Sequence, residues 1–177
     1  RRGQSSCLRL LKGGDLVILT INRARPSEAR ELTDISFASK RYWNYPEAYY
    51  IVWKDELTIT PEYIEKNKVF AARSEEGLIG YCSVAQVEQD FHAGRVFVHK
   101  GWWLEHIFIL PEHLHKGIGS RLVGFVKGWC RQNEVEMLSI FSDPNASGFY
   151  DKLGALCLGE YPSSIDGRNV LLYELAI

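Results

Sequence analysis

Apolar residues recur along the chain with two different periods, and these predict a mixture of strands and helices. The run LVILTI, residues 16–21, is rich in β-branched side chains and fits a buried strand. A helical pattern then opens at Pro26 and reaches about Phe37. Residues 39–64 contain many aromatic side chains, which in proteins usually form core or the wall of a pocket.

A β-hairpin and a longer strand are predicted in the middle of the chain. The segments KVFAARS, residues 68–74, and LIGYCSVAQVE, residues 78–88, flank a turn at Glu76 and Gly77. The second segment alternates, with one face formed by Cys82, Val84 and Gln86 and the other by Tyr81, Ser83, Ala85 and Val87. The apolar run that follows contains Gly101, which indicates a turn or a bulge within it.

Two helices are predicted in the second half of the chain. After Gly117 the apolar positions follow helical spacing, and they are Ile118, Leu122, Phe125, Val126 and Trp129. The run VEMLSIFS, residues 135–142, then fits a strand. Asp143 and Pro144 predict another helix start, because a carboxylate cap followed by proline suits the first turn. This helix should end at Gly154.

The last two strands are predicted at residues 155–161 and 169–177, joined by the turn-rich PSSIDGR. Antiparallel meanders around a central strand, glycine turn, helix and strand unit give a mixed α/β (α+β) fold. The length of 177 residues fits one domain, since domains commonly run to about 100 to 200 residues. We expect this domain to cover residues 15–177.

Residues 1–14 differ from the rest of the chain. They carry four basic residues and no acidic one, and they end in two glycines. We expect them to form a mobile arm that lies outside the fold. A remnant of expression or trimming explains such an arm better than a targeting segment does, because the apolar part of a signal peptide is missing.

The overall charge excludes some function classes. A formal charge of −1 offers no basic face for nucleic acid or for an anionic membrane. No apolar run approaches the roughly 18 to 20 residues that span a bilayer. The cysteines Cys7, Cys82, Cys130 and Cys157 lack metal-ligand spacing, so we expect free thiols, no metal and a cytoplasmic protein.

The segment PEHLHKGIGSRL, residues 111–122, carries the first candidate chemistry. Backbone N–H groups that open a helix favour phosphate, Gly117 and Gly119 allow a close approach, and Lys116 adds charge. The same glycines would also serve a plain tight turn, and spacing alone favours this turn because short glycine patterns recur by chance. Dinucleotide-binding and Walker patterns are absent, and His113 and His115 lack companion metal ligands.

Two blocks of the sequence carry a family likeness. WWLEHIFILPEHLHKGIGSRL followed by IFSDPNASGFYDKLGA resembles the GCN5-related N-acetyltransferase (GNAT) superfamily in its pyrophosphate loop and in the helix that carries an asparagine and a tyrosine. The order of strands and helices agrees from about residue 16 to residue 177. The resemblance implies a single domain with a central mixed, mostly antiparallel sheet flanked by helices, and the activity of an acetyl-CoA-dependent N-acetyltransferase.

The resemblance also implies where acetyl-CoA binds. Backbone N–H groups from Leu114 to Ser120 would hold the pyrophosphate, and the backbone of Ile107 and Ile109 would pair with the pantetheine arm. The residues implied in cofactor binding are Ile107, Phe108, Ile109, Leu114, His115, Lys116, Gly117, Ile118, Gly119, Ser120, Asn145 and Tyr150. Leu114 departs from the family pattern, which usually has Gln or Arg at that position. A contact from His115 or Lys116 could replace the side-chain contact to the cofactor that Gln or Arg would make.

Transfer of an acetyl group to an amine needs a base for the amine and an acid for the leaving thiolate. Glu105 lies on the strand that would hold the cofactor, on the face of Trp103 and Ile107, and is the candidate base. His106 points the opposite way if the strand is regular, whereas a bulge would weaken this exclusion. Glu105 as a surface ion-pair partner is the equal alternative. Tyr150 resembles the family's acid, although a Phe-Tyr pair near a helix end commonly packs in the core.

The acceptor side of the site is the least specified. Tyr42, Trp43 and Tyr45 stand where the family builds its acceptor pocket, and Arg168 with two nearby serines could close the other side. Aromatic walls suit a primary amine of a small molecule or peptide, and core packing explains these residues equally well. The alternatives in function are an acyl-CoA sensor without turnover and a nucleotide-binding module. Relatives in the family are often dimers, so a homodimer is a candidate state by analogy.

Overall fold

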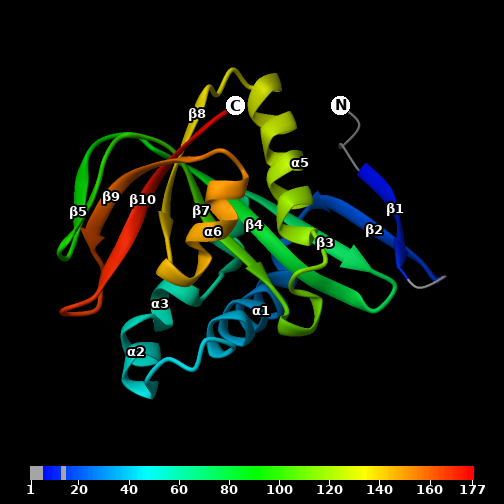
Figure 1. The fold of residues 1–177 in the computed structure, drawn as a ribbon, viewed down its shortest axis with the longest axis horizontal. Helices are drawn as coiled ribbons and strands as arrows, with labels where there is room; N and C mark the ends of the chain where they lie inside the picture. The colour runs from blue at the N-terminus through cyan, green and yellow to red at the C-terminus, as the bar shows by residue number, and fades with distance from the viewer. Residues whose placement is uncertain (1–5, 13–14) are drawn as a thin grey trace.

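The computed structural model describes residues 6–12 and 15–177, and its centre is one twisted sheet (Figure 1). The sheet has eight strands in the order β1-β2-β3-β4-β7-β8-β10-β9. The strands are β1 (Ser6–Lys12), β2 (Asp15–Arg23), β3 (Lys68–Ser74), β4 (Gly77–Val87), β7 (Gly101–Ile109), β8 (Met137–Ser142), β9 (Leu156–Pro162) and β10 (Asn169–Ala176). All neighbours pair antiparallel except β7 and β8, which are parallel. The mixed α/β fold, with a mostly antiparallel sheet flanked by helices, is therefore confirmed.

Helices cover both faces of this sheet. They are α1 (Ala29–Arg41), α2 (Glu47–Val52), α3 (Lys54–Leu57), α4 (Pro61–Lys66), α5 (Ile118–Gln132) and α6 (Ser147–Lys152), with short 3-10 turns at Pro26–Glu28, Pro111–His113 and Pro144–Ala146. The long helix α5 packs on one face, whereas α1 and α4 pack on the other. Any site at the middle of the sheet is consequently enclosed by helices from distant parts of the sequence.

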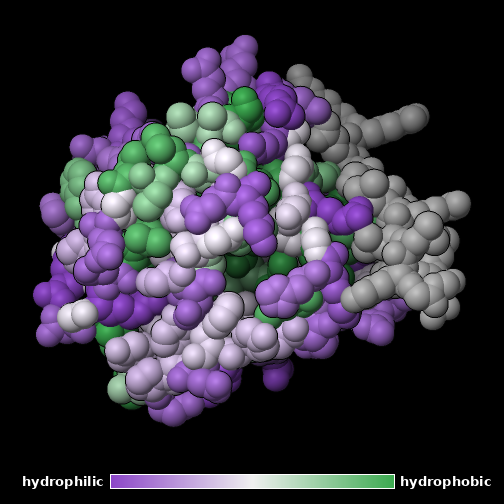
Figure 2. All heavy atoms as spheres, viewed as in Figure 1, coloured by the Kyte–Doolittle hydropathy of each residue, from purple (hydrophilic) through white to green (hydrophobic). Residues whose placement is uncertain are grey.

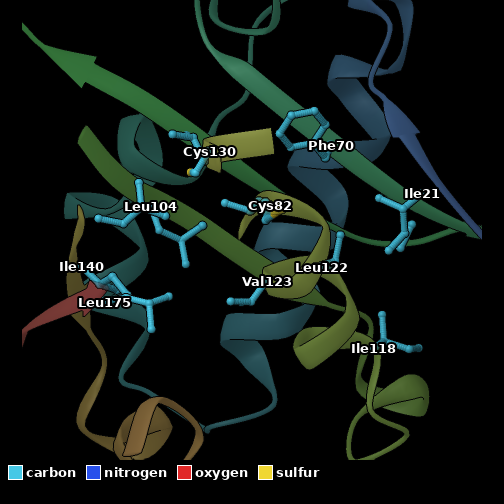
Figure 3. Close-up of a cluster of buried hydrophobic side chains, with 14 of the residues drawn as sticks. Ile21, Phe70, Cys82, Leu104, Ile118, Leu122, Val123, Cys130, Ile140 and Leu175 are labelled. Carbon is cyan, nitrogen blue, oxygen red and sulfur yellow. The ribbon is translucent and has the colours of Figure 1, made fainter. Parts of the chain in front are cut away.

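The larger core lies between the sheet and α5 (Figure 3). Helical spacing directs Ile118, Leu122 and Val126 toward the sheet, where Cys82 of β4 and Leu104 of β7 meet them. A second core forms under α1 on the opposite face of the sheet. Because side chains alternate along a strand, β4 contributes Cys82 and Val84 to the first core and Tyr81 to the second, as the sequence predicts.

The structure also departs from the sequence-based expectations. Residues 6–12 are not an arm outside the fold, because they form β1 and pair antiparallel with β2. The apolar run after residue 90 is divided into a separate hairpin, β5 (Phe91–Ala93) and β6 (Val96–Val98), followed by β7. Gly101 starts β7 with φ +143°, a conformation that favours glycine and lets the chain turn between β6 and β7.

Candidate active site

A bulge in β7 determines which side chains reach the site. Ser83 of β4 pairs with His106, but the next residue of β4, Val84, pairs with Leu104, so Glu105 is an extra residue in β7. An extra residue breaks the alternation, and Glu105 and His106 therefore project from the same face of the sheet. Glu105 keeps the face of Trp103, whereas Ile107 turns to the α5 side. The strand is therefore not regular here, and the bulge that the sequence left open as an alternative places His106 on the same face as Glu105.

Tyr63 of α4 joins these two side chains. Its hydroxyl donates to Glu105 Oε2 at 2.5 Å and lies 2.9 Å from His106 Nδ1. The Ser83 hydroxyl lies 2.7 Å from the Tyr63 hydroxyl and 3.0 Å from the same ring nitrogen. Burial, followed by the charge of Glu105, raises the pKa of Tyr63, so this phenol stays protonated at neutral pH. The cluster is a hydrogen-bond network in which two hydroxyl groups, a ring nitrogen and one exposed carboxylate lie close together.

His106 is neutral and has a defined tautomer in this network. Burial lowers its pKa, even though the nearby charge of Glu105 opposes the shift. His106 Nε2 lies 3.0 Å from the backbone carbonyl of Glu56, which can only accept, so Nε2 carries the proton. Nδ1 then accepts, and since Tyr63 donates to Glu105, Ser83 is its donor. Both ring nitrogens of His106 are hydrogen-bonded to protein groups. Glu105 is therefore the group of this pair that can bond to a molecule in the cavity.

A cavity of about 510 Å³ opens beside Glu105 and His106. This volume lies in the range typical of small-molecule sites. Its walls come from α1, α3, α4, the β5–β6 hairpin, β7, β8 and the loop before β10. Aromatic side chains at Trp53, Trp103, Phe108 and Phe141 form much of the surface. Acidic groups of α3 line it as well, namely Asp55 and Glu56.

A charged cluster lies in the wall of the same cavity. Asp143 Oδ2 accepts from Lys40 Nζ at 2.8 Å and from Arg168 Nη2 at 2.9 Å, and Asp143 Oδ1 accepts from the Tyr45 hydroxyl at 2.6 Å. Burial alone would raise the pKa of Asp143, but the charge of Lys40 and these hydrogen bonds lower it. Both cations also lie over the ring of Trp53. The carboxylate at the end of β8 thereby connects α1 with the loop before β10.

The residues expected to line the acceptor pocket have different positions. Arg168 lines the cavity, and Tyr45 lies behind it, bonded to Asp143. Tyr42 and Trp43 stack edge to face on the surface, 45% and 38% exposed, and do not line the cavity. Sequence reasoning missed Lys40, Trp53 and Tyr63 as site residues, although all three belong to the aromatic segment that it singled out.

The glycine turn after β7 opens α5. Gly117 has φ +76°, and a Cβ added there would meet no atom within 4 Å, so its surroundings are open. Gly119 is buried instead, and a Cβ there would press on the ring of Phe149 at 3.1 Å. Arg121 makes the first helical bond to Gly117, so the N–H groups just before it have no helical acceptor. The N–H of Leu114 is engaged by Pro111, and a free donor there, expected from the sequence, is wrong.

A gap between β7 and β8 adjoins this turn. Within the described residues the two strands pair only where Trp103 meets Ser139. The backbone N–H of Leu110 donates to the carbonyl of Ile79 in β4. Because the direction of the backbone groups alternates along a strand, the N–H groups of Ile107 and Ile109 point toward β8. Figure 2 shows a recess with apolar walls over β7, between α6 and the first turn of α5. An extended chain with amide groups could pair with β7 in this gap.

Tyr150 lies on α6, and Asn145 lies in the turn before it. Tyr150 is 4% exposed, and its ring packs on Phe149 and Tyr173. Burial raises the pKa of Tyr150, which keeps the hydroxyl protonated. Asp143 caps this turn by accepting from the Asn145 backbone N–H at 3.0 Å, as expected. The Asn145 side chain donates to the Tyr45 hydroxyl at 2.7 Å.

Neither metal ligation nor membrane insertion is indicated by the described residues. Among residues 19–177, no group of three or more His, Cys, Asp or Glu side chains is arranged to hold a metal ion. Of the two histidines in the glycine turn segment, His113 lies 3.5 Å from Glu76, and His115 has a positive φ of +59°. None of the helices that the structure describes has the length and apolar character needed to cross a membrane.

Comparison with known proteins identifies relatives of the chain. Residues 30–155 match the model of the acetyltransferase (GNAT) family. The PaiA N-acetyltransferase of Thermoplasma acidophilum, solved with coenzyme A, has a TM-score of 0.65 and 16% identity, over 90% of this chain and 99% of that one. A GNAT acetyltransferase of Brucella melitensis, solved with acetyl-CoA, has a TM-score of 0.60 and 17% identity, over 90% and 88% of the two chains. No curated protein matches the sequence.

Proposed function

Because the chain belongs to the acetyltransferase (GNAT) family, we propose that it transfers an acetyl group from acetyl-CoA directly to a primary amine of a small molecule or peptide. One observation carries this proposal. The exposed carboxylate of Glu105 faces a cavity of small-molecule size on the strand whose backbone borders the gap between β7 and β8. A base for the acceptor amine thus lies beside a channel suited to an acyl carrier.

The acyl donor would occupy the gap between β7 and β8. The backbone of Ile107 and Ile109 would pair with the amides of the pantetheine arm. The N–H groups at the start of α5 would bind the pyrophosphate, where the helix dipole adds positive potential and Gly117 leaves room. Lys116 and His115 lie exposed in the same turn and could contact the phosphates. Two structures of similar fold contain coenzyme A or acetyl-CoA, which supports this choice of donor.

In the transfer step the neutral amine nitrogen attacks the thioester carbonyl carbon, a C–N bond forms and the C–S bond breaks. The amine loses one proton to Glu105, either directly or through one water molecule. The departing thiolate gains one proton from the hydroxyl of Tyr150, which is kept protonated by burial. Tyr63 donates to Glu105 and holds its carboxylate toward the cavity. His106, occupied at both nitrogens, would position Tyr63 and Ser83 rather than exchange protons with the substrate.

The proposal predicts selective stabilisation by its donor. Acetyl-CoA at about 100 times its Kd should raise the Tm by about 5 to 10 °C, because binding to the folded state alone adds about 2.7 kcal/mol. Thermal shift measurements would compare it with ATP and NAD, which should leave the Tm unchanged. A rise with ATP or NAD alone would instead support a nucleotide-binding module.

Turnover separates an enzyme from a sensor. Incubation with acetyl-CoA and a panel of primary amines should release free CoA, measured as thiol against a reaction without amine. Stabilisation by acetyl-CoA without CoA release from any amine would contradict the transferase and favour an acyl-CoA sensor, for which the apolar Leu114 in the loop is the supporting observation.

We also propose that two copies associate through β9. This strand is the edge of the sheet, and Leu156 and Leu158 are 63% and 44% exposed on it. Unpaired edges with apolar side chains favour association with another strand. Light scattering should give the mass of a dimer for the wild-type chain and of a monomer for Leu158→Lys. A wild-type monomer at every protein concentration would refute the association.

A further inference from the structure

The charged cluster in the cavity wall indicates what kind of amine the site accepts. We propose that the acceptor carries a carboxylate, and that Lys40 and Arg168 bind it while its amine lies toward Glu105. This inference rests on the proposed transferase function and adds the substrate class to it. The acceptor would then be an amino acid or a related amine with one carboxylate.

Lys40, Arg168 and Asp143 together carry two positive charges and one negative charge, and the charge of Glu56 in the same cavity also acts on Lys40. Lys40 and Arg168 share a single oxygen of Asp143, and the other oxygen of that carboxylate is used by Tyr45 and by a backbone N–H. The side chains of Lys40, Arg168 and Asp143 are only 16%, 13% and 12% exposed, so water screens the excess charge poorly. A buried excess charge of this kind favours an anionic ligand.

Both cations keep donors for which the described part of the chain offers no hydrogen-bond acceptor. Within the described residues Lys40 donates one hydrogen bond, to Asp143, out of the three that an ammonium group can make. The side-chain bonds of Arg168 go through Nη2, to Asp143 and to Tyr45, which leaves Nε and Nη1. Both residues line the cavity. Two such cations can bind the two oxygens of one carboxylate.

The cavity has both acidic and basic groups in its lining, which suits an acceptor with one positively charged end and one negatively charged end. Glu105, with the α3 carboxylates Asp55 and Glu56, lines the same cavity as the two cations. An ammonium group is attracted to these acids. Glu105 passes the first proton of this group to water, which yields the neutral nucleophile, and is then free to accept the second proton in the transfer step. A carboxylate neutralises the single excess charge of the cluster, whereas a phosphate dianion would leave an excess negative charge. The observations therefore favour a carboxylate over a phosphate.

Matched acceptors test the inference on the wild-type protein. Each amino acid in a panel would be compared with its carboxamide and with the decarboxylated amine, and one phosphorylated amine would be included. The measurement is kcat/KM from CoA release. We expect the carboxylate form of the preferred acceptor to be used at least about tenfold better than its amide, because a bond to a charged partner is lost in the amide. Equal use of the two, or preference for the phosphorylated amine, would overturn the inference.

Substitution of Arg168 tests the residue itself. Arg168→Gln retains hydrogen-bond donors without the charge, so the ratio of carboxylate to amide should fall toward one, while KM for acetyl-CoA stays within about twofold. Arg168→Lys, which keeps the charge, should recover part of the ratio. The control is Arg131→Gln, an exposed arginine of α5 on the other face of the sheet. A loss shared equally by both acceptors would indicate a structural role for Arg168 and contradict the inference.

Failure of the two proposals can be told apart. If no amine in the panel releases CoA, the transferase function itself fails. If amines release CoA but the carboxylate brings no preference, the transferase stands and only the carboxylate site is refuted.

Discussion

Replacing Glu105 by glutamine is expected to lower kcat by about a hundredfold to ten-thousandfold, the range typical of a lost general base. Glutamine has nearly the same shape and can still accept from Tyr63, so the cavity should keep its form. The Kd for acetyl-CoA, measured by calorimetry, should stay within about twofold, because Glu105 projects to the acceptor face and the gap beside β8 is unchanged.

The pH dependence identifies the role of Glu105. Without a base the variant depends on acceptor that is already neutral, so below the pKa of the acceptor amine its rate should rise about tenfold for each pH unit. The wild-type rate should rise less steeply over the same interval. Glu136→Gln, at an exposed carboxylate before β8, is the matched control and should behave as wild type. An equal loss at every pH would contradict deprotonation of the amine by Glu105.

Much of the fold follows from local pattern. Alternation in β4 and helical spacing in α5 predict the correct buried faces, because one face of β4 meets the apolar face of α5 in the larger core and the other face of β4 lies in the second core. The cap at Asp143 and the end of the helix near Gly154 are also predicted, since both depend on residues adjacent in sequence. The strand β1 was not predicted, because its basic residues outweighed the alternation of Leu8 and Leu10 with Arg9.

The site was predicted less completely, for a physical reason. A bulge depends on the register between two strands, which no residue near Glu105 encodes by itself. His106 could therefore not be placed beside Glu105 from a regular period. The same holds for Tyr63, which reaches Glu105 from 42 residues away, and for Lys40, which reaches Asp143 from 103 residues away. Such contacts arise only when helices α1 and α4 pack on the sheet.

The glycine turn shows how one motif can serve two purposes. Spacing alone leaves a phosphate cradle and a tight turn as alternatives, and the surroundings of the two glycines differ in the structure. Gly117 adopts a positive φ and faces open space, whereas Gly119 permits α5 to pack closely against Phe149. An anion contact is thus expected at the first of these positions, and close helix packing requires the second.

Replacing Tyr150 by phenylalanine is expected to lower kcat by about a hundredfold or more, because the departing thiolate then lacks a positioned acid. The ring contacts with Phe149 and Tyr173 remain, so both the fold and the Kd for acetyl-CoA should change little. Stopped-flow measurement of CoA release would give kcat, and calorimetry would give Kd.

Tyr173→Phe is the matched control, since this neighbouring buried tyrosine directs its hydroxyl to Asp151 at 3.0 Å. If loosening of the core caused the loss in Tyr150→Phe, the control should lose activity to a similar degree and its Tm should fall in parallel. If proton donation causes it, only Tyr150→Phe loses turnover. A comparable loss of kcat and of acetyl-CoA affinity in Tyr150→Phe would place the hydroxyl in cofactor binding and remove it from the chemical step.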